Sequence, residues 1–197
     1  MLIVVANARR QADLFPDDQA MPEGFVYRAE VISAEEERSF AERFALLPFA
    51  PFEFHGFLGR RRVVSFGWRY DYAGRQIRSS APLPDFLLSL RERAADVAGL
   101  AADSLQQALV TEYAPGAPIG WHRDKPEFQD VVAISFLAPC LLRFRRRLGD
   151  AWERRSLDVL PRSAYVLRGA ARSEWEHSIP PLSALRYSVT FRNLRAP

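Results

Sequence analysis

The stretch "QQALVTEYAPGAPIGWHRDKPEFQDVVAISFL", residues 106–137, consists of short β-type runs that are separated by turn residues. The same pattern continues to residue 194 through "CLLRFRRR", "ERRSLDVL", "SAYVLRG" and "LRYSVTFRNL". A succession of about seven or eight short strands with turns between them is typical of a β-sandwich or a jelly-roll barrel. The sequence therefore predicts a β core over residues 105–194.

The part of the chain before this core has a mixed pattern. Residues 25–33 alternate like a strand, and residues 60–77 read as two strands that a glycine interrupts. Ser33 followed by Glu36 forms a capping box, which predicts that a helix begins there. A second helix is predicted within "APLPDFLLSLRERAADVAGL", residues 81–100. The whole chain is therefore of the α+β class, with helices first and the β core after them.

The bulk composition limits the class of protein. A chain of 197 residues suits one structural domain with a sizeable core. No apolar run is long enough to span a membrane, and we interpret the apolar start, residues 1–15, as a strand or an arm and not as a signal peptide. Cys140 is the only cysteine, which favours a reducing compartment, and we expect a cytoplasmic protein.

The cationic residues are almost all arginines. The net charge is only +3, from 27 Lys+Arg against 24 Asp+Glu, and Lys125 is the only lysine. Arginine-rich surfaces suit bidentate binding of phosphate or carboxylate, although GC-rich coding produces the same bias. The basic run "RFRRR", residues 143–147, either binds a nucleic-acid backbone or simply alternates around a strand.

A histidine and an aspartate stand two residues apart in "WHRD", as His122 and Asp124. In a strand, residues i and i+2 point to the same side, so these two can converge on one metal ion. His177 is the only histidine downstream, whereas His55 is interpreted as a loop residue. Two histidines and a carboxylate form the facial triad of non-haem Fe(II) oxygenases, but catalytic zinc can use the same ligands. A lone H-x-D pattern also occurs often by chance.

The C-terminal strand "LRYSVTFRNLR" places Arg186, Ser188, Thr190 and Arg192 on one face. Buried arginines are costly unless an anion meets them, so a small dicarboxylate between the two arginines would account for their position. The alternative is that both arginines form salt bridges with acidic residues of neighbouring strands.

Together, "EYAPGAPIGWHRDK" and "WEHSIPPLSALRYSVTFRN" resemble the AlkB family of Fe(II)- and 2-oxoglutarate-dependent dioxygenases. That family shows Y-x-P-G, H-x-D, a distal histidine and R-x-[NS]-x-T-F-R in this order. The resemblance implies a double-stranded β-helix, a jelly-roll form. We therefore expect N-terminal helices packed on one sheet, with strands, helices and a substrate-recognition lid over residues 1–104 and the dioxygenase core over residues 105–197.

The resemblance also implies roles for individual residues. The expected Fe(II) ligands are His122, Asp124 and His177, and the expected 2-oxoglutarate-binding residues are Tyr113, Arg186, Ser188 and Arg192. Arg186 would pair with the distal carboxylate, and Arg192 would lie nearer the metal. Two positions depart from the family pattern: many members have asparagine at Thr111, and some repair enzymes have an acid at Pro126.

The activity that the resemblance implies is oxidative demethylation of N-alkylated bases in DNA or RNA, with Fe(II), 2-oxoglutarate and dioxygen. Single-stranded or damaged nucleic acid would be the partner, because a base inside a duplex cannot reach such a site. Trp68 and Tyr70 would stack on the base, and Arg62 would meet a phosphate. These aromatics are otherwise ordinary packing residues. The alternatives are a methylated protein substrate, or a metal-binding jelly roll without oxygenase activity.

Overall fold

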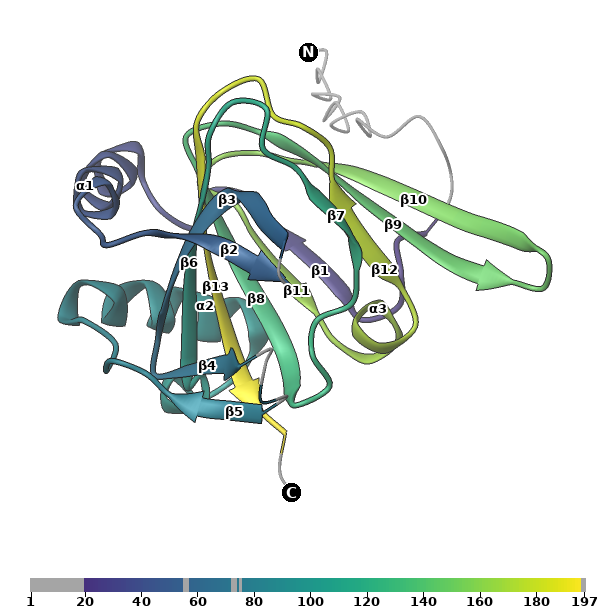
Figure 1. Cartoon of the computed structure of the whole chain (residues 1–197), viewed down its shortest axis with the longest axis horizontal. Coiled ribbons are helices and arrows are strands. Elements are labelled where there is room, and N and C mark those ends of the chain that lie inside the picture. The colour runs from purple at the N-terminus through teal and green to yellow at the C-terminus, as the bar shows by residue number, and fades with distance from the viewer. Residues whose placement is uncertain (1–19, 55–56, 72–73, 75, 196–197) are drawn as a thin grey trace, which may run out of the picture.

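The computed structural model describes residues 20–54, 57–71, 74 and 76–195 (Figure 1). The interpretations of residues 1–15 and of His55 concern positions outside the described residues.

Two antiparallel sheets form the body of the molecule. The major sheet contains β1 (Phe25–Arg28), β2 (Ala50–Phe54), β3 (Phe57–Phe66), β6 (Gln107–Tyr113), β8 (Phe128–Phe136), β11 (Ala164–Leu167) and β13 (Arg186–Leu194). Its strand order is β1-β11-β8-β13-β6-β3-β2. The minor sheet contains β7 (Ile119–His122), β9 (Cys140–Leu148), β10 (Ala151–Val159) and β12 (Glu176–Ile179), in the order β10-β9-β12-β7. A separate hairpin pairs β4 (Trp68–Asp71) with β5 (Gln76–Ser79). This mostly antiparallel arrangement is that of a jelly roll.

The helices are few and short. They are α1 (Ala34–Ala45), α2 (Leu88–Ala98) and α3 (Gly169–Ser173), with single 3-10 turns at Asp85–Leu87 and Ala102–Ser104. The capping box is confirmed, since the Glu36 backbone N–H donates to Ser33 Oγ at 3.1 Å and the Ser33 N–H donates to Glu36 Oε2 at 2.7 Å. Among the residues that the structure describes, no helix combines the length and the apolar character that crossing a bilayer would require.

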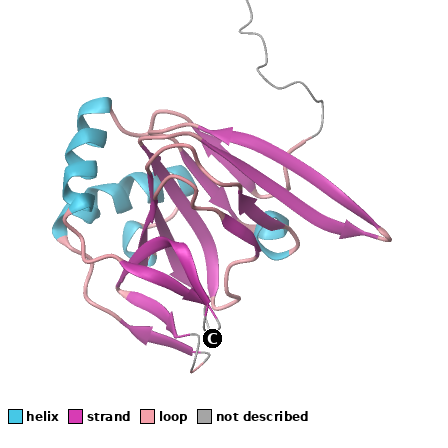
Figure 2. Cartoon of the chain, turned by 45° about the horizontal axis from the view of Figure 1, so that its top comes forward, coloured by secondary structure: helices cyan, strands magenta, loops and turns pink. Residues whose placement is uncertain are grey.

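Strand alternation divides the buried residues between two layers. On β13, Tyr187, Val189 and Phe191 belong to one apolar cluster with Phe44 of α1 and Leu90 of α2. Helices α1 and α2 therefore share their apolar core with this face of the major sheet (Figure 2). The other face of β13 carries Arg186, Ser188, Thr190 and Arg192, as the alternation predicts. A second cluster, which includes Tyr113, Phe144 and Tyr165, fills the space between the two sheets.

Three strands and one α-helix were not expected from the sequence. β2, β5, β12 and α3 are each five residues or shorter, so their patterns are too brief to recognise. β12 lies in "SEWEHSIPP", where prolines follow the strand directly. The expected strand around "WHRD" ends at His122, so Asp124 lies in the loop that follows β7.

Candidate active site

The expected metal ligands come together between the two sheets. One ligand atom from each of His122, Asp124 and His177 lies within 4.8 Å of the other two. The imidazole rings of the two histidines have their centroids 4.2 Å apart, and His177 Nε2 lies 3.8 Å from Asp124 Oδ2. Two imidazoles and one carboxylate in this arrangement form a facial triad that leaves the remaining coordination positions of a metal open.

Strand pairing places the two histidines opposite each other. His177 of β12 is the direct antiparallel partner of His122 of β7. His122 is also fixed by its own strand, because its Nδ1 lies 2.9 Å from the Gly120 carbonyl oxygen. A carbonyl only accepts, so this hydrogen bond requires the proton on Nδ1 and leaves the Nε2 lone pair for a metal. A hydrogen bond of this kind orients metal-binding histidines in many proteins.

The protonation states of the three residues suit metal binding. Burial lowers the pKa of His177 to about 3 and also lowers the pKa of His122, so both imidazoles are neutral near pH 7. Burial opposes ionisation of Asp124, but Arg192 and the two histidines outweigh it and hold the pKa of the carboxyl below its ordinary value. Two neutral imidazoles and an ionised carboxylate are the donor forms that Fe(II) requires, so the residues fit a bound metal.

Arg172 of α3 anchors the loop that follows Asp124. This arginine is buried, and its Nη2 donates to the carbonyl oxygens of Lys125 and of Phe128, the latter at 3.0 Å. The two carbonyls lie on either side of a turn that starts one residue after the metal-binding aspartate. Arg172 therefore fixes the backbone that positions Asp124.

Buried donors for an anion lie on β13. Arg186 is completely buried, and its Nη2 donates to Ser135 Oγ at 2.7 Å. Its Nε and Nη1 have no hydrogen-bond partner among the described residues, and its guanidinium carbon lies 5.0 Å from the Tyr113 ring centroid. A buried guanidinium with two unpaired donor nitrogens is costly, so this position suits a carboxylate ligand. The expected partners Tyr113 and Ser188 are both buried; Tyr113 lies opposite Arg186 in the strand pair, and Ser188 lies opposite Thr111, the position that departs from the family pattern.

Arg192 makes a different set of contacts. Its Nη2 donates to Asp124 Oδ1 at 2.8 Å and its Nη1 donates to Gln107 Oε1 at 3.0 Å. Its Nε has no partner within the described part of the chain. This arginine therefore links the C-terminal strand to a metal-binding residue and still offers one donor.

The residues expected to contact a substrate lie in two places. Trp68 and Tyr70 are on β4, and Lys125 Nζ lies 4.6 Å from the Tyr70 ring centroid. Tyr70 is thereby beside the loop that follows Asp124. Arg62 is instead held by a bidentate ion pair with Glu112, at 2.7 and 2.9 Å. Glu112 also accepts from Tyr187, which belongs to the helix-side cluster, so Arg62 lies on the face away from the triad.

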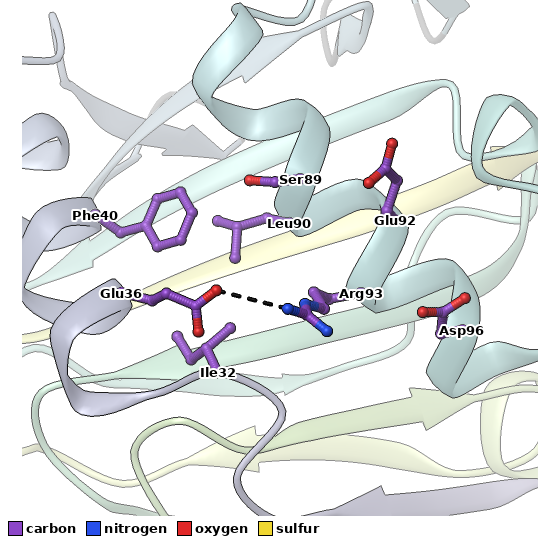
Figure 3. A pocket seen from close by; sticks show the side chains of 8 residues that line it. All are labelled: Ile32, Glu36, Phe40, Ser89, Leu90, Glu92, Arg93 and Asp96. Carbon is purple, nitrogen blue, oxygen red and sulfur yellow. Dashed lines mark ion pairs between the residues drawn. The ribbon is translucent and has the colours of Figure 1, made fainter.

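A pocket between α1 and α2 lies on the helix side of the molecule (Figure 3). It contains an ion pair between Glu36 and Arg93 at 3.7 Å, together with Phe40 and Leu90. None of the triad residues lines it. This pocket is therefore separate from the metal centre.

Sequence reasoning missed several residues that support the site. Gln107 and Ser135 bind the two arginines of β13. Gln107 could have been found by counting in twos along β6 from Tyr113, whereas no expected site residue on β8 leads to Ser135. Arg172 could not have been found in this way, because it belongs to a five-residue helix with no periodic signal.

The comparisons with known proteins agree with this geometry. The family model of the 2OG-Fe(II) oxygenase superfamily matches residues 35–192. The alpha-ketoglutarate-dependent dioxygenase AlkB of Salmonella typhimurium is 30% identical over 148 residues, which cover 65% of this chain and 67% of that protein. An Arabidopsis thaliana protein named "Alkylated DNA repair protein ALKBH8 homolog" is 29% identical over 147 residues, 62% of this chain. This chain spans only 42% of that plant relative.

The solved structure "The structure of OsALKBH1" superposes with a TM-score of 0.64 at 17% identity, covering 89% of this chain and 99% of that one. At this identity the match concerns the fold, and it confirms the expected jelly roll. The resemblance of the motifs, the His122–Asp124–His177 triad and the matched family model lead to one assignment. The chain belongs to the AlkB family within the 2OG-Fe(II) oxygenase superfamily, whose metal and co-substrate are Fe(II) and 2-oxoglutarate.

Proposed function

We propose that this protein is a 2-oxoglutarate-dependent dioxygenase that removes methyl groups from nitrogen atoms of bases in DNA or RNA. The observation that carries the chemistry is the triad, whose ligand atoms lie within 4.8 Å of one another, together with the unpaired donors of Arg186. The overall reaction converts N–CH3, 2-oxoglutarate and O2 into N–H, formaldehyde, succinate and CO2. Dioxygen is the oxidant, and Fe(II) held by the triad would supply the chemistry that activates it.

The protein residues bind and orient the reactants. Arg186 would pair with the distal carboxylate of 2-oxoglutarate through its two unpaired nitrogens, Nε and Nη1, while its Nη2 donates to Ser135. Tyr113 and Ser188 flank this arginine, and their hydroxyl groups would complete the co-substrate site. Arg192 holds one oxygen of Asp124, and its Nε is a further buried donor without a partner among the described residues.

A nucleic-acid substrate is supported by the relatives and by the residues near the site. The names of the relatives refer to alkylated DNA repair and to AlkB. We propose that the β4–β5 hairpin is the lid over the substrate, because Tyr70 reaches the loop that follows Asp124. Tyr70 and Trp68, two positions apart on β4, would stack on a flipped or single-stranded base. The lid would then belong to the N-terminal part of the chain, residues 1–104, and residues 105–197 would form the dioxygenase core.

The proposal is tested by formaldehyde release from a panel of methylated single-stranded DNA, RNA and peptide substrates, with Fe(II) and 2-oxoglutarate present. Release from an oligonucleotide and not from a peptide is the expected result. Asp124→Ala serves as the inactive control, and Asp103→Ala, an exposed aspartate in a 3-10 turn, is the matched active control. Release from methylated peptides alone would overturn the nucleic-acid substrate, and absence of 2-oxoglutarate turnover with every substrate would overturn the oxygenase activity.

A further inference from the structure

Arginines and tryptophans stack in a row on the outer face of the minor sheet. Arg143, Arg145 and Arg147 alternate along β9 with Leu142 and Phe144, which are completely buried between the sheets. The arginines therefore point outward.

Each of these arginines lies against an indole ring. The guanidinium carbons of Arg143 and Arg145 lie 5.0 and 4.5 Å from the Trp121 ring centroid, and those of Arg145 and Arg147 lie 4.4 and 5.2 Å from the Trp152 ring centroid. The row thus runs Arg143, Trp121, Arg145, Trp152, Arg147, and we call these five residues the arginine ladder.

Most of the charge on this face is not neutralised. Arg145 pairs with Glu176 at 2.6 Å. Arg143 donates to the Ser178 hydroxyl, and Arg147 donates to the Asp150 carbonyl oxygen. Arg154 of β10 lies opposite Arg145 in the strand pair and donates to the Trp152 carbonyl oxygen at 3.4 Å.

Within the described part of the chain, Arg145 is the only one of these four arginines that pairs with a carboxylate. Three arginines of this face, Arg143, Arg147 and Arg154, therefore have no carboxylate partner there, and the exposed Asp158, opposite Leu141 in the strand pair, is an acidic residue on the same face of β10.

The stacking determines what this surface can bind. Cation–π contact holds each planar guanidinium against an indole and leaves its N–H edge available for hydrogen bonds. Because arginines lie over the indole rings, those rings are less available to stack on bases. Alternate residues of β9 are about 6.6 Å apart, which is similar to the spacing of successive phosphates in an extended strand. The arginine ladder thus suits phosphate groups and does not read base sequence.

The ladder and the metal centre lie on opposite faces of the same strands. Trp121 precedes His122 on β7, and Glu176 precedes His177 on β12, so each pair points to opposite sides. β7 is an edge strand of the minor sheet, so a chain that leaves the metal centre around this edge meets Trp121 first. Figure 1 shows that the β9–β10 hairpin extends beyond the rest of the fold, which lengthens this surface.

We propose that the arginine ladder, together with Arg154, binds the phosphate backbone of the nucleic acid on one side of the nucleotide that enters the metal centre. This inference rests on the proposed nucleic-acid substrate. It assigns the contact to the outer face of the minor sheet, away from the β4–β5 hairpin. The basic run of residues 143–147 thereby has a role that alternation around a strand alone does not explain.

The test compares two triple variants that lose the same charge. One is Arg143→Gln/Arg147→Gln/Arg154→Gln, and the matched control is Arg28→Gln/Arg38→Gln/Arg43→Gln, three exposed arginines on β1 and α1. Affinity for an unmethylated single-stranded oligonucleotide of about 16 nucleotides is measured across a range of salt concentrations. Binding requires no turnover, so the result is independent of the activity assay.

Loss of three phosphate contacts should flatten the slope of log affinity against log salt by about 2. The ratio of the parent's affinity to that of the ladder variant should then change about twentyfold between about 50 and 200 mM salt. The control variant should change the slope far less. Arg143→Lys/Arg147→Lys/Arg154→Lys keeps the charges and should restore most of the slope.

A single-residue variant tests the same contact in case the triple variant disturbs folding of the β9–β10 hairpin. Arg154→Gln changes one exposed residue and should by itself flatten the slope by about 0.7. Equal slopes in the ladder and control variants, in protein that still binds Fe(II), would overturn the ladder and leave the proposed function intact. If the parent chain binds no oligonucleotide and demethylates only peptides, the proposed function fails and the ladder assignment fails with it.

Discussion

The two carboxylate oxygens of Asp124 face different partners, and Arg192 binds only one of them. Arg192 Nη2 donates to Oδ1 at 2.8 Å, whereas Oδ2 lies 3.8 Å from His177 Nε2, on the side where the histidines converge. One oxygen is therefore fixed by the last strand of the fold and the other is directed at the metal position. This arrangement favours a carboxylate that binds through a single oxygen and stays ionised.

The first prediction concerns the metal. Asp124→Ala should abolish Fe(II) binding and 2-oxoglutarate turnover, because it removes the charged ligand and leaves Arg192 without its carboxylate. Metal content after reconstitution and succinate release measure the two effects. Asp103→Ala, at an exposed turn, should retain both. Near-full activity of Asp124→Ala would show that the triad has been wrongly assigned.

The second prediction concerns the co-substrate. Arg186→Met should raise the dissociation constant of 2-oxoglutarate by at least about thirtyfold, since truncating a desolvated charged contact costs about 2 to 5 kcal/mol. The same change should leave the stability of the ligand-free protein unchanged or increase it, because Nε and Nη1 of Arg186 are buried without partners. Thermal unfolding with and without 2-oxoglutarate measures both quantities.

The matched control for this experiment is Arg28→Met, which alters an exposed arginine on β1 and should leave the 2-oxoglutarate-induced rise in Tm intact. If Arg186→Met retains that rise, the carboxylate is bound elsewhere. If the ligand-free variant is instead strongly destabilised, Arg186 has a structural partner that outweighs its unpaired donors.

The third prediction concerns pH. Burial lowers the pKa of His177 to about 3, whereas an unfolded histidine titrates near about 6.5. Between these values the unfolded state binds more protons, so the free energy of unfolding of the metal-free protein should fall as pH falls from about 6.5. Each such histidine contributes at most about 1.4 kcal/mol per pH unit.

Urea unfolding at several pH values between about 5 and 7 measures this slope. His177→Gln should reduce it, and His122→Gln/His177→Gln should reduce it further, because burial lowers the pKa of His122 as well. Asp124 contributes to this pH dependence only at lower pH. Its folded pKa lies below the ordinary carboxyl value, so the stabilisation of the folded state by its ionised carboxylate is lost as pH falls below that ordinary value. A slope that is unchanged in the double variant would contradict the buried, neutral state of these imidazoles.

The sequence predicted the parts of the site that follow strand periodicity. The period of two on β13 places Arg186 and Arg192 on one face, and the H-x-D spacing brings His122 and Asp124 together, although Asp124 lies beyond the end of β7. Pairing between distant strands could not be predicted in the same way. The direct opposition of His122 and His177 depends on β12, which is too short to recognise.

Contacts made by residues without a periodic signal also could not be predicted from the sequence. The bidentate pair between Arg62 and Glu112 depends on which strands are neighbours, and that order is set by the whole sheet. Arg62 was expected to meet a phosphate, whereas its position beside Glu112 favours a structural role. The support that Arg172 gives to the loop after Asp124 likewise appears only in the folded chain.

The last prediction concerns the β4–β5 hairpin. Lys125 Nζ lies 4.6 Å from the Tyr70 ring centroid, and Lys125 directly follows the metal-binding Asp124. Tyr70 is therefore an aromatic surface next to the entrance of the metal centre, and Trp68 stands two residues earlier on the same strand. Stacking of one base on an aromatic side chain contributes about 1 to 3 kcal/mol. Tyr70→Ala should accordingly weaken oligonucleotide binding by about tenfold to a hundredfold.

Tyr70→Phe is the matched control, because it keeps the ring and removes only the hydroxyl group. It should retain most of the affinity, and both variants should bind 2-oxoglutarate as the parent does, since that ligand is assigned to Arg186 on β13 of the major sheet and not to the β4–β5 hairpin. Loss of binding in Tyr70→Phe as well would indicate a hydrogen bond in place of stacking. Unchanged binding in Tyr70→Ala, with Trp68→Ala also unchanged, would move the base to a different surface and leave the β4–β5 hairpin without a role in substrate recognition.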